Sequence, residues 1–228
     1  MGVIGGPDLN TDSLVAYLNP ITTRCYTTGA TTATDLINNT TVNVSNGIVH
    51  TSSSLATSWN FDGTDEKLLY NANYFNDVFP TSTFTIDLWF NLNEATGYRY
   101  IFSNGYPVQI AVHGGYLKAW CAVANSGGYF INSFATVTSI NTGTWYNATF
   151  VNSATNARAW YINGVSDATN TSNGTIASSN TGDGLNIGQY GSGGYPFNGQ
   201  ISQVKLYNRV LSAAEVKENY DLMKSLFE

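Results

Sequence analysis

Residues 82–92 read STFTIDLWFNL, and the alternation in this stretch decides the fold class. Its large apolar side chains fall on one face and a mixed set falls on the other, namely Phe84, Ile86, Leu88, Phe90 and Leu92 against Thr85, Asp87, Trp89 and Asn91. A period of two places successive side chains on opposite faces of a β-strand. The stretch therefore predicts a half-buried strand.

Similar short runs follow along the chain, each bounded by Gly, Asn or Ser, at residues 100–103, 108–113, 117–124, 129–134, 145–151, 157–162, 185–190 and 201–207. Asn163-Gly164 separates two strand-like segments and suits a type I′ turn, because both residues tolerate positive φ. Residues 22–58 are rich in Thr, Ser and Asn, which favours long loops and short edge strands. Many short strands at this spacing predict an antiparallel sandwich.

A helix is expected only at the end of the chain. Ser212-Ala213-Ala214-Glu215 has the pattern of a capping box, in which the Ser hydroxyl and the Glu carboxylate bond each other's backbone N–H. The helix from Ser212 to Phe227 would dock one apolar stripe on the sandwich, formed by Val216, Tyr220, Met223 and Phe227. Since no linker or repeat divides the chain, we expect an arm at residues 1–12 and one domain at residues 13–228.

Composition excludes several classes of protein. Charged residues make up 11% of the 228 residues, and the formal net charge is −6 without a basic run, which disfavours nucleic acid and anionic membranes as partners. No segment looks like a signal peptide or has transmembrane length. Cys25 and Cys121 could form one bridge, but buried free thiols are the preferred interpretation.

Four stretches, taken in order, resemble the laminin G-like jelly rolls of the concanavalin A-like lectin and glucanase superfamily. They are SLVAYL at residues 13–18, WNFDGTD at 59–65, the strand at 84–90, and FNGQISQVKLYNRVLS at 197–212 followed by Glu215. The resemblance implies an all-β fold, a two-sheet antiparallel jelly-roll sandwich with one short C-terminal α-helix. Many relatives carry an acidic pair where this chain has Ser202-Gln203, which puts a structural calcium site in doubt.

The opening GPDLNTDSLV, residues 6–15, is similar to the start of laminin G-like proteins in virions of tailed bacteriophages. This second resemblance implies a virion surface protein that is made in the host cytoplasm. It would decorate a capsid or form a knob, with the major capsid protein or another virion protein as its partner, and self-association stays open.

Enzymatic relatives hydrolyse glycosidic bonds with two carboxylates on one strand face, one acting as nucleophile and one as acid. The five glutamates show no such spacing, at Glu66, Glu94, Glu215, Glu218 and Glu228, and Asp87 lies alone on its strand. His50 and His113 are too few for a metal cluster. We therefore expect no catalytic residues and no enzyme, with a glycan hydrolase as the disfavoured alternative.

Tyrosines near glycine pairs are the candidate carbohydrate-binding residues, because an exposed ring can stack on a sugar. The candidates are Tyr190, Tyr195, Tyr116 and Tyr129, with Tyr98, Tyr100 and Tyr106 as further members of an aromatic patch.

Asp62, Asp65 and Asp183 could present oxygens to Ca²⁺, but Asp-Gly pairs also form turns and calcium needs six or more oxygens. Turn formation is preferred, so no cofactor is expected and Ca²⁺ is the alternative.

The sequence thus predicts a non-catalytic virion surface protein that adheres to host cell-surface glycans. The alternative is a lectin-like carbohydrate-binding module outside a virion.

Overall fold

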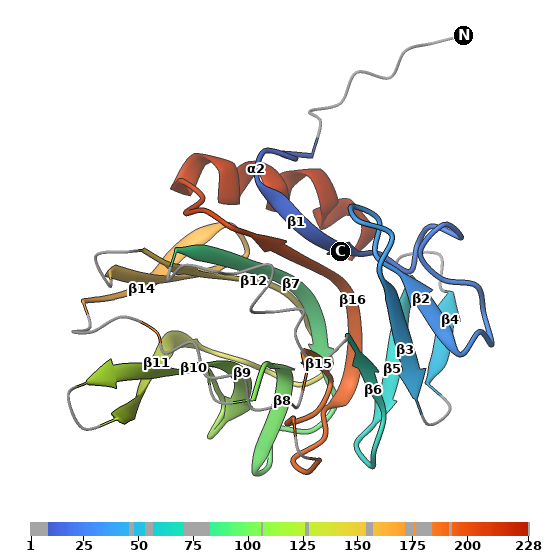
Figure 1. Cartoon of the computed structure of the whole chain (residues 1–228), viewed down its shortest axis with the longest axis horizontal. Helices are drawn as coiled ribbons and strands as arrows, with labels where there is room; N and C mark the ends of the chain where they lie inside the picture. The colour runs from blue at the N-terminus through green and yellow to red at the C-terminus, as the bar shows by residue number, and fades with distance from the viewer. Residues whose placement is uncertain are drawn as a thin grey trace, which may run out of the picture.

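A computed structural model describes residues 9–45, 48–52, 57–70, 83–105, 107–125, 128–153, 157–171, 176, 184–191 and 193–227. For residues 49, 51, 52, 124, 125, 129 and 130 the description covers the backbone alone. Two antiparallel sheets of eight strands each face one another (Figure 1). The predicted all-β sandwich is confirmed.

The first sheet has the order β14-β13-β12-β7-β16-β5-β4, and β1 pairs with β16 beside this path. The bounds are β14 (Val165–Thr171), β13 (Ala157–Ile162), β12 (Trp145–Asn152), β7 (Phe84–Leu92), β16 (Asn198–Tyr207), β5 (Thr57–Asp62), β4 (Val49–Ser52) and β1 (Leu14–Leu18). Several neighbouring strands of this sheet lie far apart in sequence, as β7 and β16 do. We call it the helix-side sheet.

The second sheet has the order β11-β10-β9-β8-β15-β6-β3-β2. The bounds are β11 (Gly128–Ser139), β10 (Tyr116–Asn125), β9 (Val108–His113), β8 (Tyr98–Ser103), β15 (Asn186–Ile187), β6 (Lys67–Leu69), β3 (Thr41–Ser45) and β2 (Thr32–Thr34). β2 and β4 end their sheets, as expected for short edge strands within residues 22–58. We call it the open sheet.

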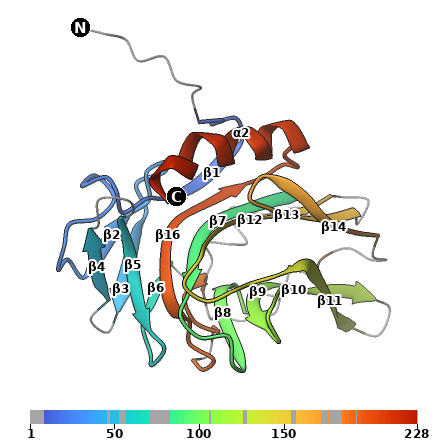
Figure 2. The ribbon, with the colours of Figure 1, turned by 180° about the vertical axis from the view of Figure 1, so that it is seen from behind.

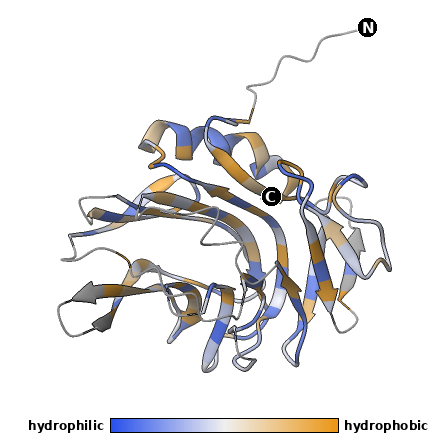
Figure 3. Ribbon diagram, viewed as in Figure 1, coloured by the Kyte–Doolittle hydropathy of each residue, from blue (hydrophilic) through white to orange (hydrophobic). Residues whose placement is uncertain are grey.

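The core fills the space between the two sheets. All five predicted apolar positions of β7 are buried there and pack with rings from both sheets, including Phe61, Phe102, Phe150 and Trp160. Hydrophobic and hydrophilic residues alternate along the strands in Figure 3. The alternation that predicted β7 therefore also decides which of its faces meets the core.

Helix α2 (Ala213–Met223) covers the outer face of the helix-side sheet (Figure 2). The capping box is present in both directions between Ser212 and Glu215, and a 3₁₀ turn, η1 (Lys224–Leu226), follows. Phe227 stacks on Trp89 with ring centroids 4.1 Å apart. The predicted docking stripe is confirmed, and none of the described helices is long and apolar enough to cross a membrane.

The polar face of β7 is buried under α2. Asp87 and Lys205 form an ion pair at 3.1 Å with both side chains 0% exposed. The other carboxylate oxygen of Asp87 accepts hydrogen bonds from Thr149 Oγ1 at 2.8 Å and Asn147 Nδ2 at 3.3 Å. Asp87, the single Asp of its strand, is thus a structural group whose hydrogen bonds are satisfied.

Two local expectations have definite outcomes. The predicted strand at residues 185–190 is wrong in length, because β15 spans only Asn186–Ile187 and Gly188 then turns the chain away with a φ of +92°. Cys25 and Cys121 are both buried free thiols, so the preferred interpretation of the cysteines is confirmed.

Glu215→Gln is expected to make the free energy of unfolding fall less steeply as the pH is lowered. The Arg209 guanidinium, 2.7 Å away, lowers the pKa of Glu215 from 4.5 to about 2, and hydrogen bonds from Ser212 also favour the carboxylate. Because the folded pKa is depressed, this stabilisation is present above about pH 4.5 and lost as the pH falls toward 2. Urea unfolding from pH 6 to pH 2 should show the gap between the wild type and the variant closing in acid.

The matched control is Glu218→Gln, which removes an exposed carboxylate of the same helix. A gap for Glu215→Gln that stays constant with pH would contradict the role given to Arg209.

Candidate functional site

The candidate site is a pocket of about 360 Å³ lined by Tyr98, Tyr100, Gln109, Trp120, Ile131, Tyr190 and Tyr195. We call it the aromatic pocket. β8, β9, β10 and β11 supply the first five residues, and the segment between β15 and β16 supplies the two remaining tyrosines.

Strand alternation places the aromatic pocket on the outer face of the open sheet. Ile110, Ala119 and Cys121 belong to the core, so their neighbours Gln109 and Trp120 face outward and lie opposite one another in register. The pocket and α2 therefore lie on opposite outer faces of the sandwich.

The rings of the pocket contact one another closely. Tyr98 lies 5.5 Å from Tyr195 and 5.8 Å from Trp120 between centroids, and Tyr100 lies 5.2 Å from Tyr190. These separations lie in the range of favourable aromatic pairs. The rings therefore support one another before any ligand arrives.

Glycines shape the segment that carries the two loop tyrosines. Gly193 and Gly194 have φ of +88° and +116°, and Tyr195 itself has a φ of +49°. The Tyr100 N–H donates to the Tyr195 carbonyl at 3.1 Å, which ties the loop to β8. Tyr195 is 56% exposed at this position. A side chain in a rarely adopted backbone conformation is a feature of binding sites.

The polar groups of the pocket are neutral. Tyr100 Oη donates to Gln109 Oε1 at 3.3 Å, and Gln109 Nε2 donates to the Gly105 carbonyl at 2.6 Å. Burial raises the pKa of Tyr100 far above its usual value, and the phenols of Tyr190, Tyr98 and Tyr195 raise it further. Tyr100 therefore keeps its proton at neutral pH and can donate a hydrogen bond.

The structure brings together only part of the predicted tyrosine set. Tyr190 and Tyr195 line the aromatic pocket with Tyr98 and Tyr100. Tyr116 lies elsewhere on the outer face, opposite His113. The backbone of Tyr129 belongs to β11, and its side chain lies outside the described part of the chain, as does all of Tyr106.

Trp120, Gln109 and Ile131 line the pocket but were not among the residues predicted from the sequence. A signal was available for Trp120, because Leu117, Ala119 and Cys121 set the inward register of the run at residues 117–124. Trp120 alternates with these inward residues and therefore faces outward. A large ring on the outside of a sheet indicates a binding surface more strongly than a ring in the core does.

The proposed calcium ligands Asp62 and Asp65 lie at the end of β5 and in the turn that follows. Asp62 Oδ1 accepts the Thr64 backbone N–H at 2.8 Å, and the Thr64 side chain is the main cause that lowers the Asp62 pKa. This is the turn geometry expected of Asp-Gly. Asp183 lies outside the described residues, within which no group of three His, Cys, Asp or Glu could hold a metal ion.

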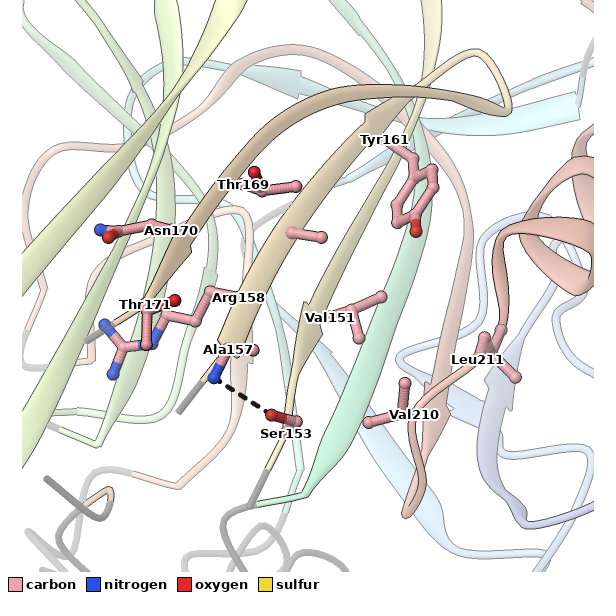
Figure 4. A pocket seen from close by; sticks show the side chains of 11 residues that line it. Val151, Ser153, Ala157, Arg158, Tyr161, Thr169, Asn170, Thr171, Val210 and Leu211 are labelled. Carbon is pink, nitrogen blue, oxygen red and sulfur yellow. Dashed lines mark hydrogen bonds between the residues drawn. The ribbon is translucent and has the colours of Figure 1, made fainter. Parts of the chain in front are cut away.

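A second pocket of about 440 Å³ lies on the outer face of the helix-side sheet near the start of α2 (Figure 4). Val151, Tyr161, Val210 and Leu211 contribute apolar surface to it. The Arg158 side chain points away from Val210 and Leu211 in Figure 4, and it is 2% exposed, with its Nε donating to Asn152 Oδ1 at 2.9 Å. The charged group of Arg158 therefore does not define this second pocket.

Three solved structures illustrate the similarity of the fold. Trypanosoma rangeli sialidase in complex with sialic acid matches at a TM-score of 0.68 and 14% identity, over 97% of this chain and 35% of that one. The botulinum neurotoxin serotype D binding domain matches at 0.61 and 13%, over 92% and 52%. Domain 4 of AbnA, a GH43 extracellular arabinanase from Geobacillus stearothermophilus, in complex with arabinotriose, matches at 0.68 and 16%, over 91% and 98%.

The chain thus spans about a third of the length of the sialidase chain and nearly all of the arabinanase domain. The comparison with curated proteins found no match. A family model covers residues 61–217, more than half of the chain, and includes β7, the strands of the aromatic pocket and the capping box. The chain belongs to the concanavalin A-like lectin/glucanases superfamily.

Proposed function

We propose that this chain is a non-catalytic glycan-binding module and that the aromatic pocket is its binding site. The observation that carries the proposal is the outward-facing group of four tyrosines and one tryptophan around a pocket of about 360 Å³. Aromatic faces stack on the apolar C–H faces of sugar rings, and phenol and amide groups supply the hydrogen bonds that orient them.

The shape of the pocket suits a sugar. A small number of polar groups among apolar walls is typical of small-molecule sites. Gln109 and Tyr100 are the polar groups at the floor, since both are buried, whereas Tyr195 is exposed at the rim. The similar arabinanase domain is in complex with arabinotriose, which supports a glycan as the ligand.

The chemistry of the pocket supports binding without catalysis. Glycosidases commonly act through two carboxylates, and the lining residues that the structure describes carry phenol, indole, amide and alkyl groups. The raised pKa of Tyr100 opposes a phenolate nucleophile at neutral pH. A reducing-sugar assay that shows turnover abolished by Tyr100→Phe would contradict this proposal.

We also propose that a virion presents this module on its surface, in contact with the capsid or another virion protein. The support is the similarity of residues 6–15 to the start of bacteriophage virion proteins. Asn10 Nδ2 donates to Glu215 Oε1 at 2.7 Å, which ties the chain before β1 to the α2 side (Figure 1). Attachment on the α2 side would therefore leave the aromatic pocket, on the opposite outer face, facing outward.

Electron microscopy of virions carrying an antibody against the protein tests this location. Labelled particles are expected, and protein found only in the free fraction of the lysate would contradict the proposed location on the virion.

Trp120→Ala is expected to weaken glycan binding by about 1–3 kcal/mol, which is a 5- to 150-fold higher Kd, because it removes a ring from the pocket wall. A glycan array identifies the ligand, and calorimetric titration of that ligand gives the Kd. Tyr161→Ala is the matched control, since it removes a half-buried ring from the opposite outer face. Binding that Trp120→Ala leaves unchanged, or that both variants weaken equally, would contradict the assignment to the aromatic pocket.

A further inference from the structure

We propose that the glycan is acidic and that the sugar unit beside the aromatic pocket presents its carboxylate to Lys118. This inference rests on the proposed function, because it places a second subsite next to the first. It arises from a row of rings that leaves the aromatic pocket at Tyr98, and from one cation beside that row that does not line the pocket.

The row of rings crosses three strands of the open sheet. Tyr98 of β8 lies opposite His113 of β9, which lies opposite Tyr116 of β10. The rings of Tyr98 and His113 stack at 3.9 Å with 11° between their planes, and Tyr116 is 41% exposed. Because Tyr98 also lines the pocket, the aromatic surface continues from the pocket to Tyr116.

Lys118 lies beside this row with a fixed ammonium group. Its Nζ lies 3.1 Å from His113 Nδ1. An ammonium group can only donate, so His113 Nδ1 is the acceptor in this contact. The hydrogen bond therefore holds Lys118 in place without neutralising its charge.

Lys118 is one of four cations of the described residues without a carboxylate partner, the others being Arg24, Lys67 and Arg158, and it is the one that lies beside the row of rings. The ion pairs within the described residues use Arg99, Lys205, Arg209, Lys217 and Lys224 as their cations. Lys118 has no carboxylate within 4.0 Å in that part of the chain, although the net charge of the protein is −6. A ligand anion can supply the missing charge.

The spacing along β10 fits neighbouring sugar units. Lys118 and Trp120 lie two residues apart on the same face, which places their Cα atoms about 7 Å apart. A glycan with one ring against Trp120 therefore brings its next unit over Lys118 and Tyr116. A carboxylate on that unit can accept charge-assisted hydrogen bonds from the ammonium group.

The test compares an oligosaccharide that contains hexuronic acid with its carboxyl-reduced form, which differs only in charge and in that one group. Wild-type protein is expected to bind the acidic form about two- to fivefold more tightly in calorimetry at low salt, the size typical of an exposed ion pair. The preference should fall as salt is added. Lys118→Met should abolish the preference while its Kd for the reduced form stays within about twofold of the wild-type value.

Lys67→Met is the matched control, because it removes the same charge from β6 of the same sheet. It should leave the preference intact. Equal wild-type affinity for both forms, or loss of the preference in Lys67→Met, would overturn the inference. Preference for a sulfated analogue but not for the uronate would overturn the assignment to a carboxylate.

A failure of the proposed function has a different signature. In that case neither form binds, or Trp120→Ala leaves the binding of both forms unchanged. If Trp120→Ala weakens binding but the wild type binds the acidic and the carboxyl-reduced forms equally well, only the subsite at Lys118 is refuted.

Discussion

Lys205→Met is expected to lower the free energy of unfolding by about 3–5 kcal/mol, because it leaves a buried carboxylate without its counter-charge. Asp87 and Lys205 are both 0% exposed and lie 3.1 Å apart beneath α2. The hydrogen bonds from Thr149 and Asn147 satisfy one oxygen of Asp87 but supply no positive charge. Truncation of one partner therefore costs much more than an exposed pair does.

The double variant Asp87→Asn with Lys205→Met should recover a large part of the loss, since it removes both charges and keeps an acceptor for Thr149. Urea unfolding of the four proteins of this cycle measures the coupling. Lys217→Met breaks the exposed pair with Asp221 and serves as the control, with an expected cost far below that of Lys205→Met. A Lys205→Met protein no less stable than Lys217→Met would refute the role of the pair.

The sequence predicts strand β7 and helix α2, but it does not predict that Asp87 and Lys205 form an ion pair between them. Alternation places Asp87 and Trp89 on the less apolar face of β7, and the capping box with its apolar stripe predicts the helix. Lys205 lies 118 residues from Asp87, so no local pattern links them. Only the pairing of β16 with β7 brings both under α2. Local rules therefore predicted the elements, whereas the buried ion pair depends on sheet order.

The candidate site shows the same division. Tyr190 and Tyr195 were predicted from a glycine-rich loop, which is a local signal. Trp120 was not selected, because its place beside those tyrosines depends on β8, β9 and β10 lying next to one another in a register that the sequence does not show. Gln109 is similarly inconspicuous in sequence and acquires its role only as the buried partner of Tyr100.

Gly188 ends β15 well short of the strand predicted at residues 185–190, and the contacts of this glycine explain why. A Cβ built at Gly188 would lie 2.2 Å from Cε1 of Phe61, whose ring is fully buried and packs against Phe197. The Gly188 N–H donates to the Ile101 carbonyl, and its own carbonyl accepts from the Phe197 N–H. Gly188 thus holds the start and the end of the segment that carries Tyr190 and Tyr195.

Gly188→Ala is therefore expected to lower the free energy of unfolding by about 2–5 kcal/mol and to weaken glycan binding with it. The cost combines the overpacking of a full core, about 1–3 kcal/mol, with the strain of a φ of +92° in a residue that has a Cβ, about 1–2 kcal/mol. Gly193→Ala separates the two contributions, because its φ of +88° is nearly the same while its Cβ would meet nothing within 4 Å. In thermal and urea unfolding, the stability lost by Gly193→Ala should equal the backbone-strain contribution alone. If both variants lose the same stability, the contact with Phe61 does not constrain the segment, and the aromatic pocket must take its shape from the strands rather than from Gly188.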